Sequence, residues 1–247
     1  MTASSSRSPV RVAMWSGPRN LSTALLRSWE NRPDTQVLDE PLYAHYLATT
    51  GLDHPGRADI IAAGPTSADE AIARCLAPLS NGNTISYQKH MSHHLLPDVD
   101  RGWLDEVYNL LLIRDPVLVL ASYASVRSDV TLADIGLLQQ VELAERAELI
   151  VDSSDFLEDP ERYQRAVCAN VGIDFTPAML RWPAGTRSSD GCWAPHWYAA
   201  VEASTGFGPP SRSGRPEVES LPAHLQPLAT EARSIYNQLA ADRLLFT

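Results

Sequence analysis

Residues 12–26, VAMWSGPRNLSTALL, place a short apolar run before a polar turn and a second apolar segment. The apolar run predicts a strand over 11–15, because strands buried in a sheet are short and continuously hydrophobic. The Gly-Pro pair that follows breaks the strand and turns the chain. The spacing after the turn predicts a helix over 21–31. A strand, a tight turn and a helix in this order indicate an α/β fold.

The turn of this segment has the composition of an anion-binding loop. Backbone N–H groups at a helix N-terminus are unpaired and carry partial positive charge, so they attract phosphate or sulfate. Asn20 or Ser22 can cap the helix, and Ser22 and Thr23 add hydroxyl donors. Arg19 adds a permanent charge with a planar set of donors. The G-x-x-x-x-G-K-[ST] pattern of ATP and GTP enzymes is missing. An ordinary capped turn remains the alternative interpretation of this stretch alone.

The rest of the chain alternates strand-like and helix-like patterns. We expect further strands over 36–39, 84–88, 108–113 and 148–152. We expect further helices over 67–79, 116–126, 138–147, 159–171 and 223–241. This alternation predicts one α/β domain over 10–247, with a parallel sheet of about five strands and helices on both faces.

Composition narrows the class of protein. The 247 residues carry a net charge of −10, which argues against a nucleic-acid partner. No run of eighteen apolar residues occurs, so no membrane span is expected. Three widely spaced cysteines fit a reduced cytoplasm. We expect a disordered tail over 1–9 and a mobile Gly/Pro/Ser-rich loop over 204–222. The oligomeric state is not predicted.

A second segment, LLLIRDPVLVLASY at 110–123, supports an anion site. Arg114 ends a predicted strand, and Asp115-Pro116 is a typical helix opening with Asp as N-cap. Ser122 follows Arg114 by about two helical turns. In open α/β sheets, ligands bind beyond the C-terminal strand ends. Arg19 and Arg114 would both lie at that edge.

These segments resemble the sulfotransferases that use 3′-phosphoadenosine 5′-phosphosulfate (PAPS). Residues 18–23, PRNLST, are similar to the P-[KR]-S-G-[TS]-T loop of that family, with Asn for Ser and Leu for Gly. Arg114-Asp115-Pro116 through Ser122 resembles its R-[ND]-P-x5-S segment. The resemblance implies that Arg114 and Ser122 hold the 3′-phosphate. It implies a P-loop-like nucleotide site at the C-terminal strand ends. There the 5′-phosphosulfate would be held by Gly17, Pro18, Arg19, Asn20, Leu21, Ser22 and Thr23.

Two further segments resemble the same family. DFLEDP at 155–160 is similar to the turn Y-E-D-L-x-x-D-P, although a Ser takes the place of the adenine-contacting Tyr. GCWAPHW at 191–197 is similar to G-D-W-x-x-H-F, which implies that Trp193 lies near the cofactor. Arg187 would be the basic 3′-phosphate contact, with its register shifted by about one residue.

Sulfuryl transfer also needs a group that takes a proton from the acceptor, and two candidates compete. QKHMSHHLLP at 88–97 resembles the K-x-H-x4-L-L-P segment that carries the family's catalytic histidine. This implies His90 as the base, with Lys89 one residue after the family's lysine position. Glu40, in VLDEPLYAHY at 37–46, resembles a Glu-Pro motif of bacterial and carbohydrate sulfotransferases. The spacing favours His90 over Glu40. Tyr43 and its neighbours His45 and Tyr46 would then line the acceptor pocket.

The resemblance implies transfer of a sulfuryl group from PAPS, as co-substrate, to a hydroxyl or amine of a small-molecule acceptor. No metal is expected, because the His-x-x-His-His spacing fits no recognised metal site. A P-loop small-molecule kinase is the alternative enzyme, but it would need a lysine in the loop and Mg²⁺. A non-catalytic nucleotide-binding module is the third hypothesis. It would keep Arg19 and Arg114 without a working base.

Overall fold

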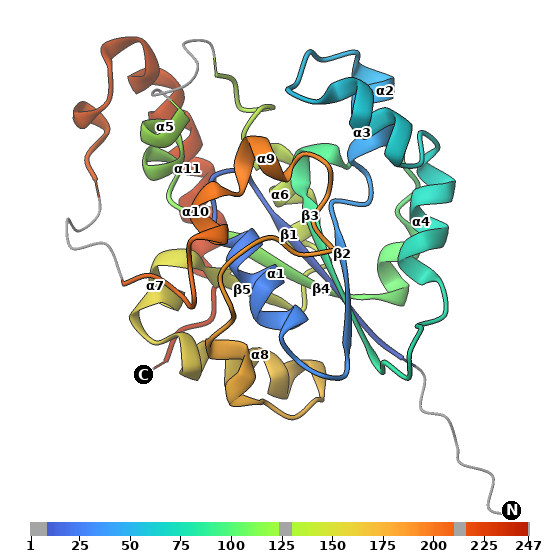
Figure 1. Cartoon of the computed structure of the whole chain (residues 1–247). Coiled ribbons are helices and arrows are strands. Elements are labelled where there is room, and N and C mark those ends of the chain that lie inside the picture. The colour runs from blue at the N-terminus through green and yellow to red at the C-terminus, as the bar shows by residue number, and fades with distance from the viewer. Residues whose placement is uncertain (1–8, 124–129, 210–215, 247) are drawn as a thin grey trace, which may run out of the picture.

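The structure is a computed structural model that describes residues 9–123, 130–209 and 216–246. It confirms a single α/β domain with a five-stranded parallel sheet (Figure 1). In spatial order the strands are β2 (Thr35–Asp39), β3 (Ile85–Met91), β1 (Val10–Ser16), β4 (Tyr108–Ile113) and β5 (Leu149–Asp152). Because β1 lies between β3 and β4, the loop after β1 emerges at the middle of the carboxyl edge, where the strand order reverses.

Helices cover both faces of the sheet (Figure 1). One face packs on α1 (Ser22–Glu30), α7 (Ser153–Glu158) and α8 (Pro160–Val171). The other face packs on four helices: α4 (Ala68–Leu76), α5 (Pro116–Tyr123), α6 (Leu137–Ala144) and α11 (Gln226–Ala241). Alternate residues of β1 serve the two cores: Val12 and Met14 point to the first, and Ala13 and Trp15 to the second.

A third, smaller apolar cluster lies apart from these two cores. It joins four short helices: α2 (Tyr43–Thr50), α3 (Arg57–Ala63), α9 (Ala194–Trp197) and α10 (Ala199–Glu202). Tyr43, Tyr46 and Trp193 are among its buried side chains. The same ends of β2 and β3 that carry the candidate catalytic residues lead into this cluster.

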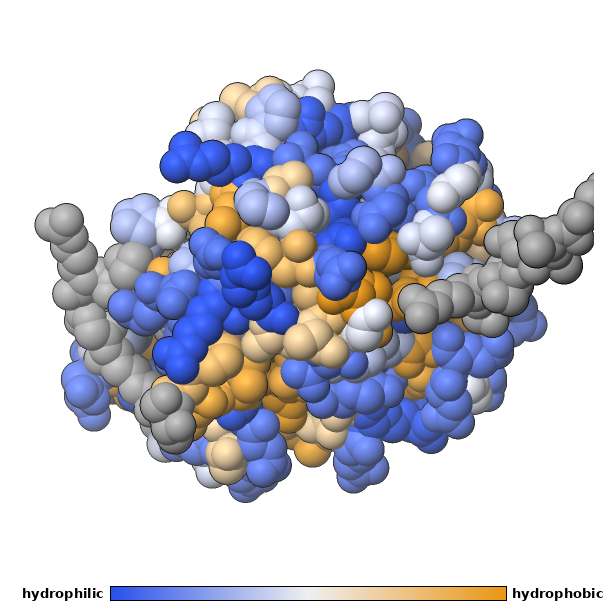
Figure 2. All heavy atoms as spheres, turned by 90° about the horizontal axis from the view of Figure 1, so that it is seen from below, coloured by the Kyte–Doolittle hydropathy of each residue, from blue (hydrophilic) through white to orange (hydrophobic). Residues whose placement is uncertain are grey.

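Several expected segments differ in detail. Residues 1–8 of the expected tail, residues 124–126 of the helix expected over 116–126, and residues 210–215 of the expected mobile loop lie outside the described residues. The C-terminal helix begins at Gln226, after a short 3₁₀ turn at Ala223–Leu225. The face seen from below in Figure 2 gathers apolar side chains near its middle, surrounded by hydrophilic ones. Within the described residues, no helix is long and apolar enough to cross a membrane.

Candidate active site

The loop after β1 is shaped by close backbone packing. Gly17 has no room for a side chain, because a Cβ atom there would lie 2.7 Å from the carbonyl oxygen of Ile135. Arg19 has a φ of 57°, in the left-handed region that is unusual for a residue other than glycine. Such strained residues gather at functional sites. The loop therefore holds Arg19, an exposed residue, in a backbone conformation that its own preferences do not explain.

The structure brings Arg19, Arg114 and Ser122 together. Arg19 Nε donates to Ser122 Oγ at 2.8 Å. Arg114 Nη1 donates to the carbonyl oxygen of Arg19. Burial lowers the pKa of the Arg114 guanidinium, and the nearby charge of Arg19 lowers it further. Among the described residues, neither guanidinium forms an ion pair with a carboxylate. Within the part of the chain that the structure describes, two like charges are thus held close together without a direct counter-ion.

The N-terminus of α1 adjoins this pair and is not closed by a side chain. Leu21 takes the N-cap position and makes no capping hydrogen bond, and the first turn carries no acidic residue. Asn20 does not cap the first turn of the helix: its Nδ2 donates to the carbonyl of Leu112 at 3.0 Å, and its Oδ1 accepts from Leu21 N. Ser22 and Thr23 begin the helix, with Ser22 buried. The N–H groups of this turn therefore carry partial positive charge and receive no hydrogen bond from a capping side chain.

A second cluster of charges lies at the ends of β2 and β3. Lys89 is buried, and its Nζ donates to Asp39 Oδ1 at 3.0 Å, to Glu40 Oε1 at 2.5 Å and to Tyr198 OH at 2.7 Å. Tyr198 OH in turn donates to Asp39 Oδ2 at 2.6 Å, and Trp193 Nε1 donates to Tyr198 OH at 3.1 Å. The cluster therefore ties Trp193, from the third apolar cluster, to the sheet edge.

The electrostatics of this cluster follow from its burial. Burial opposes the charge on Lys89, but Asp39 and Glu40 outweigh it and hold the pKa of Lys89 well above its usual value. Burial raises the pKa of Glu40, and the charge of Lys89 offsets part of this effect. Glu40 has a φ of 44°, so it is also in the left-handed region. With one lysine and two carboxylates, the cluster can accept a proton without losing its ion pair.

The structure does not bring His90 to this cluster. β3 continues to Met91, so Lys89 and His90 lie on opposite faces of the same strand. The His90 ring stacks on Trp15 with ring centroids 4.2 Å apart, and the residue is 1% exposed. Burial and the nearby Lys89 charge lower the pKa of His90 to about 3. His90 therefore sits in the core as a neutral ring.

The histidines that follow pack against aromatic rings of α2. His94 stacks on Tyr43 and on Tyr46, with centroid distances of 4.5 and 4.6 Å. His93 meets Tyr46 edge-on. His45, by contrast, bonds to the carbonyl of Thr66 through Nδ1. His94 Nδ1 lies 4.0 Å from Glu40 Oε2, so this group of stacked rings adjoins Glu40. His45 is instead tied to the segment between α3 and α4.

Arg187 lies away from the arginine pair. Its Nε is 3.6 Å from Glu30 Oε2, at the last residue of α1, and its Nη2 donates to the carbonyl of Pro183. The nine residues of α1 separate this end from the loop by about 13 Å. The segment is fixed there by Arg27, a buried residue of α1 that forms two hydrogen bonds with Asp190. Arg187, whose register is shifted by about one residue from the family's basic position, therefore lies at the far end of α1 from the arginine pair.

Comparison with known proteins agrees with this arrangement. A family model described as a sulfotransferase domain matches residues 10–233. The chain belongs to this sulfotransferase domain family. The match covers the loop of Arg19, the segment of Arg114 and the Lys89 cluster, so it includes both groups of site residues.

Relatives of this sulfotransferase domain occur as parts of longer chains. It is 32% identical over 213 residues to branched-chain-amino-acid aminotransferase-like protein 1 of Arabidopsis thaliana, which covers 84% of this chain and 38% of that protein. It is 31% identical over 207 residues to protein 2 of the same name, which covers 81% and 37%. The chain thus spans less than two fifths of the length of these relatives.

A solved structure shares the fold of this sulfotransferase domain. The sulfotransferase domain from the Synechococcus PCC 7002 olefin synthase has a TM-score of 0.50 and 19% sequence identity, over 96% of this chain and 98% of that one. At this identity the likeness concerns the fold. Membership of the sulfotransferase domain family supports a transferase.

Two residues of the Lys89 cluster, Asp39 and Tyr198, were not predicted as site residues from the sequence. Asp39 precedes Glu40 at the end of a predicted strand, which is a signal for a role at the sheet edge. Tyr198 carries no such signal, because it lies 109 residues from Lys89 in the chain. Its placement depends on the path of the segment after Arg187, which no local pattern reveals.

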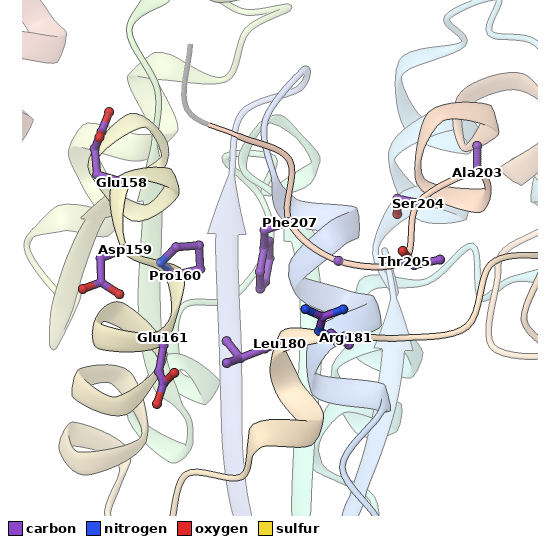
Figure 3. Close-up of a pocket in the computed structure, with 11 residues that line it drawn as sticks. Glu158, Asp159, Pro160, Glu161, Leu180, Arg181, Ala203, Ser204, Thr205 and Phe207 are labelled. Atoms are coloured by element: carbon purple, nitrogen blue, oxygen red, sulfur yellow. The ribbon is translucent and has the colours of Figure 1, made fainter. Parts of the chain in front are cut away.

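The sulfotransferase domain has a shallow cavity of about 660 Å³ away from the arginine pair (Figure 3). Phe207 and Leu180 lie at its middle, Glu158, Asp159 and Glu161 at one side. A narrow crevice lies between the loop after β1 and α6, and Gly17 and Arg114 are among the residues that line it. Among the described residues, no group of three or more histidine, cysteine or acidic side chains is arranged to hold a metal ion.

Proposed function

We propose that this chain transfers a sulfuryl group from PAPS to a hydroxyl or amine of a small-molecule acceptor. The observation that carries the proposal is the pair Arg19 and Arg114, held together beside the uncapped N-terminus of α1. Like charges repel, so the fold sustains this pair at a cost that a bound dianion would offset. Family membership supplies the reaction class, and the arrangement of the pair supports a donor with two separate anionic groups.

The donor side is assigned to the arginine pair. Arg19 and the N–H groups of the α1 turn would hold the 5′-phosphosulfate, and Arg114 with Ser122 the 3′-phosphate. When the bond between sulfur and the bridging oxygen breaks, its electron pair stays on the 5′-phosphate. The negative charge on the 5′-phosphate is larger in the transition state than in the bound donor. Arg19 therefore stabilises the transition state more than it stabilises the bound donor.

The acceptor side is assigned to Glu40 and Lys89. Glu40 follows the end of β2, two strands from β1, so its backbone is about 10 Å from β1. Its side chain is 10% exposed, whereas His90 is enclosed by core rings. We therefore propose Glu40, rather than His90, as the group that takes the acceptor proton. Lys89 would hold the Glu40 carboxylate in place.

The raised pKa of Glu40 suits this role. An effective base has a pKa close to the working pH, and burial moves the pKa of Glu40 in that direction. A hydroxyl or amine placed against Glu40 Oε2, the oxygen that Lys89 does not hold, would give up its proton as its own oxygen or nitrogen bonds to sulfur. The rings of Tyr43 and Tyr46 would contact an apolar part of the acceptor.

Two other functions make different predictions. A kinase would need Mg²⁺ and a lysine in the loop, whereas Arg19 stands in the loop and Lys89 is engaged at the other cluster. A non-catalytic nucleotide-binding module would bind nucleotide but transfer nothing. Dependence of activity on added Mg²⁺ separates the kinase, and transfer itself separates the module.

The test is transfer of ³⁵S from labelled PAPS to a panel of small hydroxyl and amine compounds. We expect labelled product from at least one acceptor with the wild-type chain, in the presence of a chelator. Arg19→Ala serves as the matched control and should abolish the product. Transfer that is equal with Arg19→Ala, or that requires Mg²⁺, would contradict the proposal.

A further inference from the structure

Helix α11 donates hydrogen bonds to the carboxylates at the ends of two strands. Tyr236 OH donates to Asp152 Oδ2, at the end of β5, at 2.6 Å. Arg233 Nη2 donates to both oxygens of Asp115, just after β4, at 3.0 and 2.9 Å. Both aspartates are 2% exposed, so these bonds are shielded from water. Donors and acceptors lie more than eighty residues apart in the chain, so the contacts are tertiary.

These two carboxylates lie next to Arg114 in the fold. Asp115 follows Arg114 in the chain, and Asp152 pairs with Ile113, the residue before Arg114, in the register of β4 and β5. Asp152 and Asp115 both act on the Arg114 guanidinium electrostatically, and they partly counter the effects of burial and of Arg19. Neither forms an ion pair with Arg114 in the described structure, although Asp115 is its neighbour in the chain. Arginine and carboxylate often pair through two parallel hydrogen bonds, which need both carboxylate oxygens. Tyr236 holds Oδ2 of Asp152, and Arg233 holds both oxygens of Asp115.

We propose that Tyr236 and Arg233 are positioning residues that hold Asp152 and Asp115 away from Arg114 and so keep its guanidinium available to an anionic ligand. The inference rests on the proposed function only in taking that ligand to be the 3′-phosphate of a nucleotide. It assigns to α11 a role in ligand affinity in addition to packing against the sheet.

Each of these two aspartates also caps the start of a helix, which gives its side chain a structural role. Asp152 Oδ1 accepts from Ser154 N at 2.7 Å and caps α7, while Oδ2 is held by Tyr236. Asp115 likewise accepts from Val117 N at 2.9 Å at the start of α5. Asparagine caps helices as well as aspartate does. The cap and the charge can therefore be separated by substitution.

Tyr236→Phe removes the donor to Asp152 and keeps the ring. The test measures the binding of adenosine 3′,5′-bisphosphate and of adenosine 5′-phosphate to the full chain by calorimetry. If Asp152 then forms an ion pair with Arg114 in about nine tenths of the molecules, only about one tenth can bind the 3′-phosphate. The Kd for the bisphosphate then rises about tenfold. The Kd for the monophosphate should change less than twofold. Tyr236→Phe with Asp152→Asn should restore the wild-type Kd, because the competing charge is gone and the cap is kept.

A second pair keeps the test decisive if Tyr236→Phe does not fold. Arg233→Gln should raise the Kd for the bisphosphate and leave the Kd for the monophosphate nearly unchanged. Adding Asp115→Asn to the same chain should restore the wild-type Kd. A purely structural role predicts equal losses for both nucleotides and no recovery on adding the asparagine. That outcome, or an unchanged Kd in the single variants, would overturn the inference while leaving the proposed function in place. A wild-type chain that binds both nucleotides equally would overturn both.

Discussion

Replacing Lys89 with methionine should strongly destabilise the chain. Lys89 is 1% exposed and donates to Asp39, Glu40 and Tyr198. Methionine fills similar volume, but it leaves two buried carboxylates without their cation. Breaking a buried ion pair from one side costs about 3–5 kcal/mol. In a domain of this size each kcal/mol lowers Tm by about 2–4 °C, so we expect a shift of roughly 6–20 °C.

Urea unfolding followed by circular dichroism measures this loss, and pH adds a second test. The pKa of Glu40 is already raised, and loss of Lys89 raises it further, so the carboxylate takes up a proton more readily. The loss of unfolding free energy should therefore be smaller at pH 5 than at pH 8. Arg165→Met is the matched control, because Arg165 is 57% exposed and pairs with Glu161 on one helix. A loss for Lys89→Met no larger than that of the control would refute the reasoning.

Three further predictions concern the reaction and its pH dependence. Arg19→Ala should lower kcat more than it raises the Kd for the donor, and Arg19→Lys should retain part of the activity; equal kcat in both variants and wild type would remove Arg19 from the mechanism. Glu40→Gln should lower turnover by roughly 10²–10⁴-fold. His90→Phe keeps the stacking on Trp15 and should leave turnover within a few-fold of the wild-type value. The reverse result in initial-rate assays would make His90 the base. The folded-state pKa values of His90, about 3, and His93, about 4, lie below the ordinary 6.5, so their contribution to stability is complete above pH 6.5 and is lost as pH falls toward those values. Unfolding titrations should show a slope of about 1.4 kcal/mol per pH unit for each histidine, and His90→Phe with an unchanged slope would contradict this account.

The sequence predicted the sheet well because its strands are buried on both faces. Each of the five expected strands is present, with ends that move by no more than three residues. The largest of these shifts matters for the site. Ending β3 at Gln88 left Lys89 and His90 free to share one surface, whereas a strand that continues to Met91 sends them to opposite faces. An error in a strand end thus became an error in the environment of a proposed base.

The helices of the third apolar cluster were not predicted. α2 and α3 are short, and Gly64 approaches Ala44 so closely that a Cβ atom there would lie 2.7 Å from it. Such short helices are stabilised by packing on each other rather than by their own periodicity. The position of Tyr198 depends on the same packing. Local patterns therefore located Arg19 and Arg114 at strand ends but could not assemble the cluster around Lys89.

The preference for a 3′-phosphorylated nucleotide tests the central claim most directly. Calorimetry on the wild-type chain compares adenosine 3′,5′-bisphosphate with ATP under the same salt concentration. ATP lacks the 3′-phosphate that we assign to Arg114, and a charge-assisted hydrogen bond contributes about 1.5–3 kcal/mol. We therefore expect the bisphosphate to bind about tenfold to a hundredfold more tightly. ATP that binds equally well, or more tightly, would contradict the assignment of this site to a PAPS-dependent sulfuryl transfer.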